Sequence, residues 1–416
     1  MQLRELELEE FRSFRSLRLE LDRSGFRAIG ANASGKSTLL EAIAMLSTTR
    51  SPQTSTERDI PHWSSGVDFG VSPYARLRGV FSREDGTHSV EIGLGYEERT
   101  GRSRKLVRLD DRPVRAVDAV GQLKSVIFTP GDVELLAGSP ANRRRFLDIG
   151  IGQASRPYLK ALTRYARVLE QRNGLLRVWS RERATPDRRR TSQELAFWDA
   201  ELGLAGTEVI GHRVGAVRFV SDRARVHFRH LTSVDSLEVR YASHRFVIPS
   251  DLEVLSWSDP AQDARQRIAA AFERSLGATR EEELRRGATA IGPHRDDFQV
   301  FADGVDLGRF GSRGQQRLAI VALKLAELEL LEEAAGESPV LLLDDVLSEL
   351  DSTHRGLLLE ALAERSTQIC LTSTDAVDLG ASSLARLPLL RIVQGAVEHE
   401  DAGLQADDDL PGRSHK

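Results

Sequence analysis

The residues of this chain best suited to binding a nucleotide form one glycine-rich segment, residues 30–37, and Thr38 follows it. The segment fits the pattern G-x-x-x-x-G-K-[ST] in full, and in that pattern backbone N–H groups converge on nucleotide phosphates. Lys36 would reach the β- and γ-phosphates, and Ser37 would ligate Mg²⁺. A strand expected over 26–29 and a helix over 37–46 make a chance glycine turn the weaker interpretation. The segment reads Gly30-Ala31-Asn32-Ala33-Ser34-Gly35-Lys36-Ser37.

A phosphate-binding loop also needs a carboxylate that holds the metal ion, and a pair of carboxylates near the other end of the chain can supply it. The apolar run 340–343 predicts a buried strand that ends at Asp344 and Asp345. Asp344 would hold Mg²⁺ directly or through water, and Asp345 would orient or deprotonate an attacking water. Taken alone, a strand that ends in turn aspartates is a serious alternative. Together with the phosphate-binding loop, the pair indicates the second half of an NTPase site.

Two further segments resemble elements of ABC ATPases. Ser312, Arg313, Gly314 and Gln315 precede a predicted helix, as in the ABC signature, and 348–351 resembles the D-loop. In that class the signature serine and the helix N-terminus contact the γ-phosphate of ATP bound to the other subunit. A serine–glycine helix cap is the alternative for the first segment. The resemblance implies a homodimer that holds ATP between its copies, with hydrolysis controlling their association.

The elements that must position these residues indicate an α/β fold. Alternating apolar residues predict antiparallel strands over 75–80, 90–94 and 105–109, and a buried strand over 368–371. Helical spacing dominates 139–180 and 192–230, with a polar loop expected over 181–190 and strands near 236–247 and 298–301. We therefore predict an ABC-type P-loop ATPase head built from both chain ends, with an inserted and mainly helical arm. The expected ranges are 1–127 for the first part of the head, 128–285 for the arm, 286–397 for the second part of the head and 398–416 for a disordered tail.

Composition narrows the class of protein. The chain has 416 residues, of which 40% are hydrophobic and 29% charged, with a formal net charge of −4. Its single cysteine, Cys370, excludes a disulfide within the chain and reads as a small buried hydrophobe in a reducing compartment. The N-terminus alternates like a strand and not like a signal peptide, and no stretch approaches the ~20 apolar residues of a membrane span. We expect a cytoplasmic protein without membrane contact.

The spacing of the two half-sites indicates which member of the class this is. Lys36 and Asp344 lie 308 positions apart, whereas transporter subunits place these motifs much closer and SMC proteins insert a far longer coiled coil. A moderate helical insertion resembles the RecF family of bacterial recombination-mediator ATPases. The order of short local matches supports the resemblance: Phe11-Arg12-Ser13-Phe14, Asn32, Phe128-Thr129-Pro130, Ser139-Pro140, Arg143 to Asp148, Gln171-Arg172-Asn173, Phe197-Trp198-Asp199 and Gly292 to Asp297.

The resemblance implies a function and a set of site residues. It implies binding of ATP with Mg²⁺, binding of single-stranded or duplex DNA at gaps or junctions, and slow, DNA-stimulated ATP hydrolysis used as a switch. The expected partners are RecO and RecR, which help to load the recombinase RecA on strands coated by SSB. Residues that would contact the nucleotide are 30–38, Arg12, Ser312, Gly314, Gln315 and Asp351.

Four positions are notable against the pattern of the RecF family or of ABC ATPases in general, and the aspartate at 345 is a trait that the RecF family shares. Ala33 stands where glycine is usual, and alanine is tolerable there only if its φ is negative. Arg313 occupies a variable signature position. Asp345 stands where many ABC ATPases have glutamate, which suggests slow hydrolysis. Gln122 is the nearest glutamine to the expected Q-loop, but it is shifted along the sequence.

A basic segment is the candidate DNA surface. Residues 141–190 hold 14 Lys and Arg against 4 Asp and Glu, although the whole chain is negative. Such a cluster would attract phosphates, while the alternative for any one arginine is a solvated helical surface. The best candidates are Arg143, Arg144, Arg145, Arg188, Arg189 and Arg190. Because aromatic residues are sparse, we expect backbone contacts without sequence specificity.

Two other functions stay open at this stage. An ABC-headed ATPase of another DNA transaction, such as an anti-phage or nuclease-coupled system, would need a second catalytic domain within the arm. A DNA scaffold with a degenerate nucleotide site is disfavoured by the intact Lys36, Ser37, Asp344 and Asp345. His294 could serve as a ligand or base, but a lone histidine beside proline and arginine is more often structural.

Overall fold

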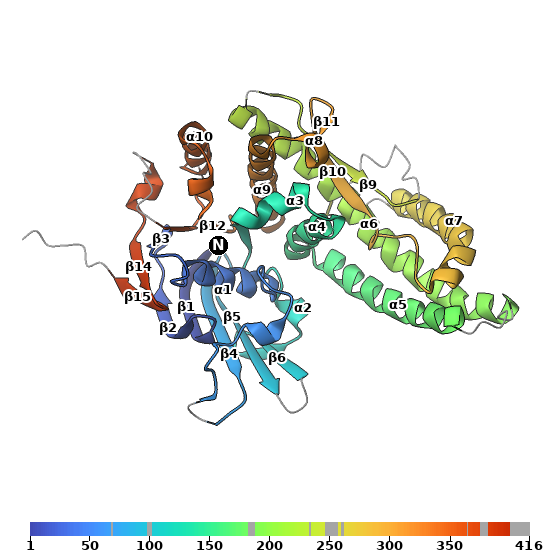
Figure 1. Ribbon diagram of the computed structural model, residues 1–416, viewed down its shortest axis with the longest axis horizontal. Helices are drawn as coiled ribbons and strands as arrows, with labels where there is room; N and C mark the ends of the chain where they lie inside the picture. The colour runs from blue at the N-terminus through green and yellow to red at the C-terminus, as the bar shows by residue number, and fades with distance from the viewer. Residues whose placement is uncertain are drawn as a thin grey trace, which may run out of the picture.

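A computed structural model shows a head from which a long helical arm extends, as seen on the right of Figure 1. None of the helices in the described ranges combines the length and apolar character that a membrane span requires. The structure describes residues 1–67, 70–97, 102–181, 188–232, 234–245, 257–258, 262–363, 365–374 and 382–399.

The centre of the head is a six-stranded sheet to which both chain ends contribute. Its order is β15-β14-β3-β13-β12-β8, and all neighbours are parallel except β14 and β15. The register sets Gly25 of β3 opposite Ile369 of β13, so the predicted joining of distant chain ends is confirmed. The bounds are β3 Gly25–Ile29, β8 Ser125–Phe128, β12 Val340–Asp344, β13 Ile369–Ser373, β14 Leu389–Val393 and β15 Ala396–His399.

A second six-stranded sheet is antiparallel and lies entirely in the N-terminal part of the chain. Its order is β2-β1-β4-β5-β6-β7, and its strands alternate between buried and more exposed residues, as the sequence predicts. The three strands expected between 75 and 109 are all present. The bounds are β1 Gln2–Phe11, β2 Phe14–Glu20, β4 Tyr74–Arg83, β5 Gly86–Glu97, β6 Arg102–Leu109 and β7 Arg112–Val114.

Two hydrophobic cores meet at the parallel sheet, and β12 separates them. Val340 and Leu342 point into the core shared with helix α1, Lys36–Thr48, and with the antiparallel sheet. Leu341 and Leu343 point into the core shared with helix α9, Arg313–Ala335. A strand covered on both faces must be continuously apolar, which explains the run that the sequence shows. Cys370 lies fully buried in β13, as expected, and burial raises the pKa of its thiol.

The arm is built from long helices and a small third sheet. Its helices are α4 Pro140–Ala154, α5 Arg156–Arg181, α6 Arg188–Thr232 and α7 Gln262–Arg286. Arg188 to Arg190 are therefore helical, which corrects the loop expected over 181–190; residues 182–187 lie outside the described part of the chain. The third sheet has the order β11-β10-β9 and joins β9 Glu238–Ala242 to β10 Asp297–Ala302 and β11 Val305–Asp306. The domain boundary expected after residue 285 thus lies between β9 and β10, although these two strands pair with each other.

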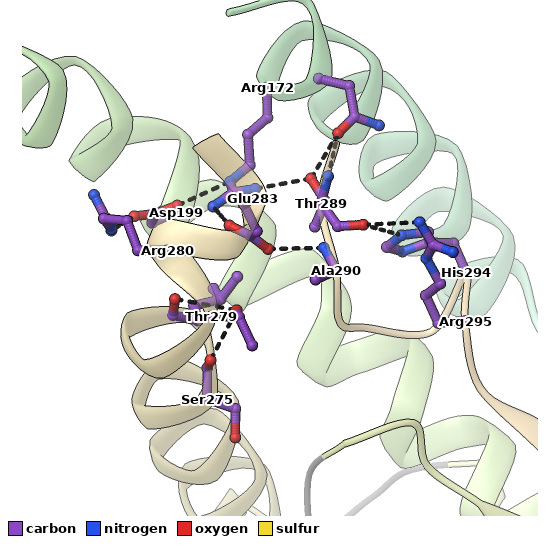
Figure 2. Close-up of polar contacts among 12 residues, drawn as sticks. Arg172, Asp199, Ser275, Thr279, Arg280, Glu283, Thr289, Ala290, His294 and Arg295 are labelled. Atoms are coloured by element: carbon purple, nitrogen blue, oxygen red, sulfur yellow. Dashed lines mark hydrogen bonds and ion pairs between the residues drawn. The ribbon is translucent and has the colours of Figure 1, made fainter. Parts of the chain in front are cut away.

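A buried arginine ties the arm helices together. Arg172 of α5 is fully buried and donates to Asp199 of α6 at 2.9 Å, to Glu283 of α7 at 2.6 Å and to Thr289 at 2.8 Å (Figure 2). The other oxygen of Glu283 accepts from the backbone N–H of Ala290 at 2.8 Å. Because each charge has a partner of opposite sign or a hydrogen bond, the network fixes how three helices and the 289–290 segment pack.

Short elements complete the head. The C-terminal strand reaches His399, so the tail expected from residue 398 begins at least two residues later, and residues 400–416 lie outside the described part of the chain. The short helices are α2 Ala116–Ala119, α3 Glu134–Ala137, α8 Leu307–Phe310 and α10 Ser352–Ala363, and the 3₁₀ segments are Glu57–Asp59, Pro130–Val133, Val346–Glu349 and Ser383–Arg386.

Candidate functional site

The glycine-rich loop connects β3 to α1 at the carboxyl edge of the parallel sheet. Gly35 has φ 115°, and a Cβ there would lie 2.8 Å from Oγ of Ser13. At Gly30 a Cβ would lie 2.3 Å from the carbonyl oxygen of Ile392. Both positions therefore require glycine. Helix α1 begins without a side-chain cap and has no acidic residue in its first turn, so its first N–H groups and its positive end suit an anion.

Ala33 has φ 61°, so the negative φ that would make alanine tolerable at this position is not found. Alanine in the left-handed region costs about 1–2 kcal/mol, and surrounding contacts must impose it. The turn between β14 and β15 makes such a contact, because the N–H of Gly395 donates to the carbonyl oxygen of Ser34 at 3.0 Å. Within the loop, the N–H of Ser34 donates to the carbonyl oxygen of Ala31 at 3.3 Å. A segment distant in sequence thus helps to shape the loop.

The ammonium group of Lys36 lies within the loop. Its Nζ donates to the carbonyl oxygens of Gly30 at 2.7 Å and Ala31 at 2.8 Å. The side chain is largely buried, and its charge is satisfied by these two oxygens. A cation is therefore held where a phosphate on the α1 N-terminus would approach.

Three oxygen-bearing side chains from three elements converge beside the loop. Oγ of Ser37 donates to Oδ1 of Asp344 at 2.7 Å, and Oγ1 of Thr372 donates to the same oxygen at 2.7 Å. The parallel register explains the meeting, because it sets Asp344 opposite Thr372 at the ends of β12 and β13. A hydroxyl and a carboxylate oxygen are ligands that Mg²⁺ prefers, so the donor set fits this ion.

Thr372 is a site residue that the motif analysis missed. It follows a buried strand that was predicted over 368–371, and the ends of neighbouring parallel strands meet at one edge of a sheet. That rule was the available signal. The Thr372 hydroxyl orients the carboxylate of Asp344 from the neighbouring strand.

Asp345 is held in a turn directly after Asp344, the candidate metal ligand. It has φ 51°, and its N–H donates to the carbonyl oxygen of Thr372 at 3.2 Å. Its Oδ1 accepts from the hydroxyl of Ser348 at 2.9 Å. The left-handed backbone turns the second carboxylate away from the strand direction, and Ser348 fixes its orientation.

Arg12 supports the helix that carries Lys36 and Ser37. Its guanidinium donates to both carboxylate oxygens of Glu41 in α1, at 3.0 and 2.7 Å, and to the carbonyl oxygen of Asp59 at 2.6 Å. Glu41 is fully buried. The structure therefore shows a positioning role for Arg12, and the nucleotide contact expected for it stays a prediction.

The signature residues form the exposed start of α9. Oγ of Ser312 accepts from the N–H of Gln315 at 3.2 Å, and the Gln315 side chain accepts from the N–H of Ser312 at 3.0 Å, which is a capping box. Residues 312–315 are exposed, and a Cβ on Gly314 would meet no atom within 4 Å. Helix α8, which leads into α9, lies well away from α1 in Figure 1. One copy therefore does not bring the signature to its own loop.

The D-loop candidate is attached to the signature helix. The carboxylate of Asp351 accepts from the N–H groups of Thr353 at 3.0 Å and His354 at 3.1 Å, and thus caps α10. The hydrogen bond with the His354 side chain is the main cause that lowers the pKa of Asp351. Arg317 of α9 forms an ion pair with Glu349 and donates to its carbonyl oxygen at 3.1 Å. The signature helix and the D-loop are therefore linked by a side chain.

Gln122 does not occupy the Q-loop position. It precedes β8, where its side chain contacts Arg83 at 3.2 Å and the carbonyl oxygen of Asp118 at 3.3 Å. The opposite end of β8, where Phe128 pairs with Leu343, is the end beside the carboxylates. The glutamine lies at the wrong edge of the sheet because a short loop leads into the strand there.

The arginines expected to bind DNA in α4 make internal contacts instead. Arg143 forms a bidentate ion pair with Asp297 of β10, at 2.7 and 2.9 Å. Arg144 donates to the carbonyl oxygen of Asp296 at 2.8 Å, and burial is the main cause that lowers its pKa. Arg145 donates to the carbonyl oxygen of Ser51 at 2.8 Å. These contacts fix α4 to β10 and to the head, and the DNA role expected for 143–145 stays a prediction; the side chains of 188–190 lie outside the described residues.

His294 is a structural residue, as its sequence context suggested. Its Nδ1 lies 2.6 Å from the hydroxyl of Tyr165, and burial is the main cause that lowers its pKa to about 4. The imidazole is therefore neutral at pH 7. Among the described residues, no group of three or more His, Cys, Asp and Glu side chains is arranged to hold a metal ion.

Comparison with known proteins gives a consistent result. The family of the RecF/RecN/SMC N terminal domain matches residues 2–385. The DNA replication and repair protein RecF of Thermomicrobium roseum is 43% identical over 402 residues, covering 96% of this chain and all of the relative. Its counterpart in Chloroflexus aggregans is 40% identical over 95% of this chain and 99% of its own length. A solved structure of the recombination mediator protein RecF-ATP in the RecFOR pathway superposes with a TM-score of 0.79 at 28% identity, covering 96% of this chain and 98% of that one.

Proposed function

Because this chain belongs to the RecF family of DNA replication and repair proteins, we propose that it is an ATP-controlled DNA-binding switch of recombinational repair. The convergence of Ser37, Asp344 and Thr372 beside an uncapped helix N-terminus carries the proposal. The similarity to a solved RecF-ATP structure over nearly the whole chain supports ATP as the nucleotide.

The residues of one copy divide the work of holding Mg-ATP. The N–H groups at the start of α1 and the ammonium of Lys36 bind the phosphates. Ser37 and Asp344 hold Mg²⁺, which when bound would neutralise developing charge on the phosphates. Thr372 keeps the carboxylate of Asp344 oriented, and Asp345 orients or deprotonates the attacking water. Because Asp345 has a shorter side chain than glutamate, we expect slow hydrolysis.

The second half of the nucleotide site comes from another copy of the chain. Ser312 and the start of α9 are exposed, and helix α8, which leads into α9, lies away from α1 in Figure 1, so they are free to contact the γ-phosphate held by a partner copy. Arg317 links this helix to Glu349 of the D-loop, so both elements would meet the partner together. ATP would thus join two heads, and its hydrolysis would release them.

In the cell, the switch would act on DNA with gaps or junctions. The family relationship and the RecFOR pathway of the solved neighbours support a role with RecO and RecR in loading the recombinase on coated single strands. Contacts to the DNA backbone would give affinity without sequence preference.

Sedimentation velocity with and without Mg-ATP tests the proposal. The intact protein should shift from monomer to dimer with ATP, and gapped duplex DNA should bind more tightly to the dimer. Lys36→Ala should abolish the shift, because the phosphates lose their cation. Arg218→Ala removes an exposed positive charge from α6 and serves as the matched control. Dimerisation of Lys36→Ala equal to that of the control would refute the shared site.

A further inference from the structure

Helix α5 has one buried face and one strongly basic face. Its buried side chains recur at helical spacing: Tyr158, Tyr165, Val168, Arg172 and Leu176. The opposite face carries six basic side chains, all of them exposed, and Glu170 is its only acidic residue. The six are Arg156, Lys160, Arg164, Arg167, Arg177 and Arg181.

Few of these charges are used within the chain. Arg156 pairs with Asp118 of α2 at 2.9 Å, and Arg164 pairs with Glu201 of α6 at 2.6 Å. In the ranges that the structure describes, Lys160, Arg167 and Arg177 form no ion pair. In contrast, the side chains of Arg143, Arg144 and Arg145 form an ion pair or hydrogen bonds within the chain. The positive charge that the sequence concentrates over 141–190 therefore reaches solvent mainly along α5, because Arg143 and Arg144 of α4 are half-buried and only Arg145 of that helix is exposed.

The buried side of α5 holds the basic face in a fixed position. Arg172 anchors the helix to Asp199 and Glu283 (Figure 2), and Asn173 accepts from the backbone N–H of Thr289 at 2.8 Å. The helix thus cannot rotate about its axis without breaking the ion pair between the fully buried Arg172 and Glu283. A rigid row of charges loses less entropy on binding a regular polyanion than flexible side chains on a loop would lose.

The dimensions of α5 suit duplex DNA. The helix has 26 residues, so it is ~39 Å long at 1.5 Å per residue. One turn of B-DNA is about 34–36 Å long. In Figure 1 the helix runs along the lower edge of the arm, from the head to the far end, and no other element lies on its outer side in that view. Its charges could therefore meet phosphates across about one turn of duplex.

We propose that the outward face of α5 is the DNA-backbone contact surface of this protein, with duplex DNA lying along the arm beside Lys160, Arg167 and Arg177. The proposal rests on the proposed function, because it assigns the surface for a ligand proposed there. It replaces 143–145 as the DNA-binding part of the basic segment. An acidic protein is the competing ligand for the same charges, and the experiment below separates the two.

The test combines three substitutions on the basic face. The variant Lys160→Gln, Arg167→Gln, Arg177→Gln removes three charges and touches no residue of the nucleotide site. Its matched control, Arg218→Gln, Arg225→Gln, Arg274→Gln, removes three exposed charges from α6 and α7. Affinity for a duplex with a single-stranded gap is measured by fluorescence anisotropy, with Mg-ATP, from 50 to 200 mM salt. ATP-dependent dimerisation of both variants is measured by sedimentation.

The counterion theory of polyelectrolytes fixes the expected result. Each lost phosphate contact lowers the slope of log affinity against log salt by about 0.9. The α5 variant should therefore lose up to about 2.7 of slope and bind roughly tenfold or more weakly at low salt, while it still dimerises with ATP. The control should match the unaltered protein in both slope and affinity.

Two failures are distinguishable. If the unaltered protein binds no DNA with ATP, the proposed function itself fails. If the unaltered protein binds DNA and the α5 variant retains the same affinity and slope, the assignment to α5 is overturned and the charges serve another ligand, such as an acidic protein. Equal losses in both variants would likewise overturn it, because total charge would then decide the affinity.

Discussion

At the scale of single residues, the candidate site is a set of hydrogen bonds between segments far apart in sequence. Asp344 accepts from Ser37, 307 positions away, and from Thr372 of the neighbouring strand. Each hydroxyl satisfies a lone pair of a largely buried carboxylate, which would otherwise pay a desolvation cost. The site is therefore oriented by the protein's own groups before any ligand arrives, which is what electrostatic preorganisation requires.

Ala33→Gly tests the left-handed backbone of the phosphate-binding loop. Glycine relieves a penalty of about 1–2 kcal/mol at φ 61° and costs about 0.5–1 kcal/mol of chain entropy. We expect the free energy of unfolding to stay equal or to rise by up to about 1.5 kcal/mol. The control Ala31→Gly, at a position without positive φ, should lose about 0.5–1 kcal/mol. Chemical denaturation that shows equal losses in both variants would contradict a strained Ala33.

His294→Gln tests the burial of a neutral imidazole. The pKa of His294 is about 4 in the folded chain and about 6.5 when unfolded. As pH falls from 6.5 to 4, the unfolded chain takes up a proton that the folded chain refuses, so stability is lost in this window. The loss should reach roughly 3 kcal/mol in the unaltered protein and disappear in the variant, which keeps an acceptor for Tyr165.

The quantity to compare is the difference between the stability–pH profile of the unaltered protein and that of His294→Gln. Burial raises the pKa of Asp296 to about 6, so its own effect on stability has the opposite sign in the same window. That effect is present in both proteins and cancels in the difference. Parallel profiles between pH 4 and 6.5 would show that His294 is not held neutral.

At the scale of elements, the sequence predicted the strands and helix starts that are determined by residues close together in the chain. The strand before Asp344 is apolar at every position because both of its faces are buried, and such a run is visible in the sequence. The start of α9 was visible too, because Ser312 and Gln315 form a capping box within four residues. The start of α6 at Arg188 was missed, because a charged segment reads as a loop even though arginine favours helices.

Pairings between distant elements were not predictable from the pattern. Nothing local shows that Arg143 meets Asp297, or that Gly395 contacts the loop at Ser34. The basic segment 141–190 was recognised correctly as unusual, but its charges divide between internal ion pairs and solvent according to tertiary packing. The Q-loop glutamine could not be placed from the sequence for the same reason, because the distance of Gln122 from Asp344 depends on which end of β8 lies at the site.

Arg172→Met tests the buried network that holds the arm helices. The substitution leaves the fully buried Glu283 without its cation, whereas the partly exposed Asp199 keeps its ion pair with Arg280. Breaking a buried pair from one side costs about 3–5 kcal/mol, so the free energy of unfolding should fall by that amount in urea denaturation. Arg167→Gln on the outer face of the same helix is the control and should change stability by less than about 0.5 kcal/mol. Equal free energies of unfolding for the unaltered protein and Arg172→Met would show that the network does not stabilise the packing of the arm helices.

At the scale of the whole molecule, the two halves of the nucleotide site lie on separate surfaces of one copy. The loop, Ser37 and Asp344 lie at the edge of the parallel sheet, and the signature lies at the exposed start of α9 near the root of the arm (Figure 1). Since β12 and α9 share one hydrophobic core, neither half can move far without the other. In the function proposed above, a second head completes the site, and the arms of both copies would be placed by that union.

Mixing two inactive variants tests this account most directly. Lys36→Ala has a defective loop and an intact signature, and Ser312→Arg has the reverse. Each alone should fail to dimerise with Mg-ATP in sedimentation velocity. Their mixture should recover ATP-dependent dimers, because a mixed pair contains one complete site made of the loop of the Ser312→Arg chain and the signature of the Lys36→Ala chain. A mixture that stays as monomeric as its two components would contradict a nucleotide site shared between copies.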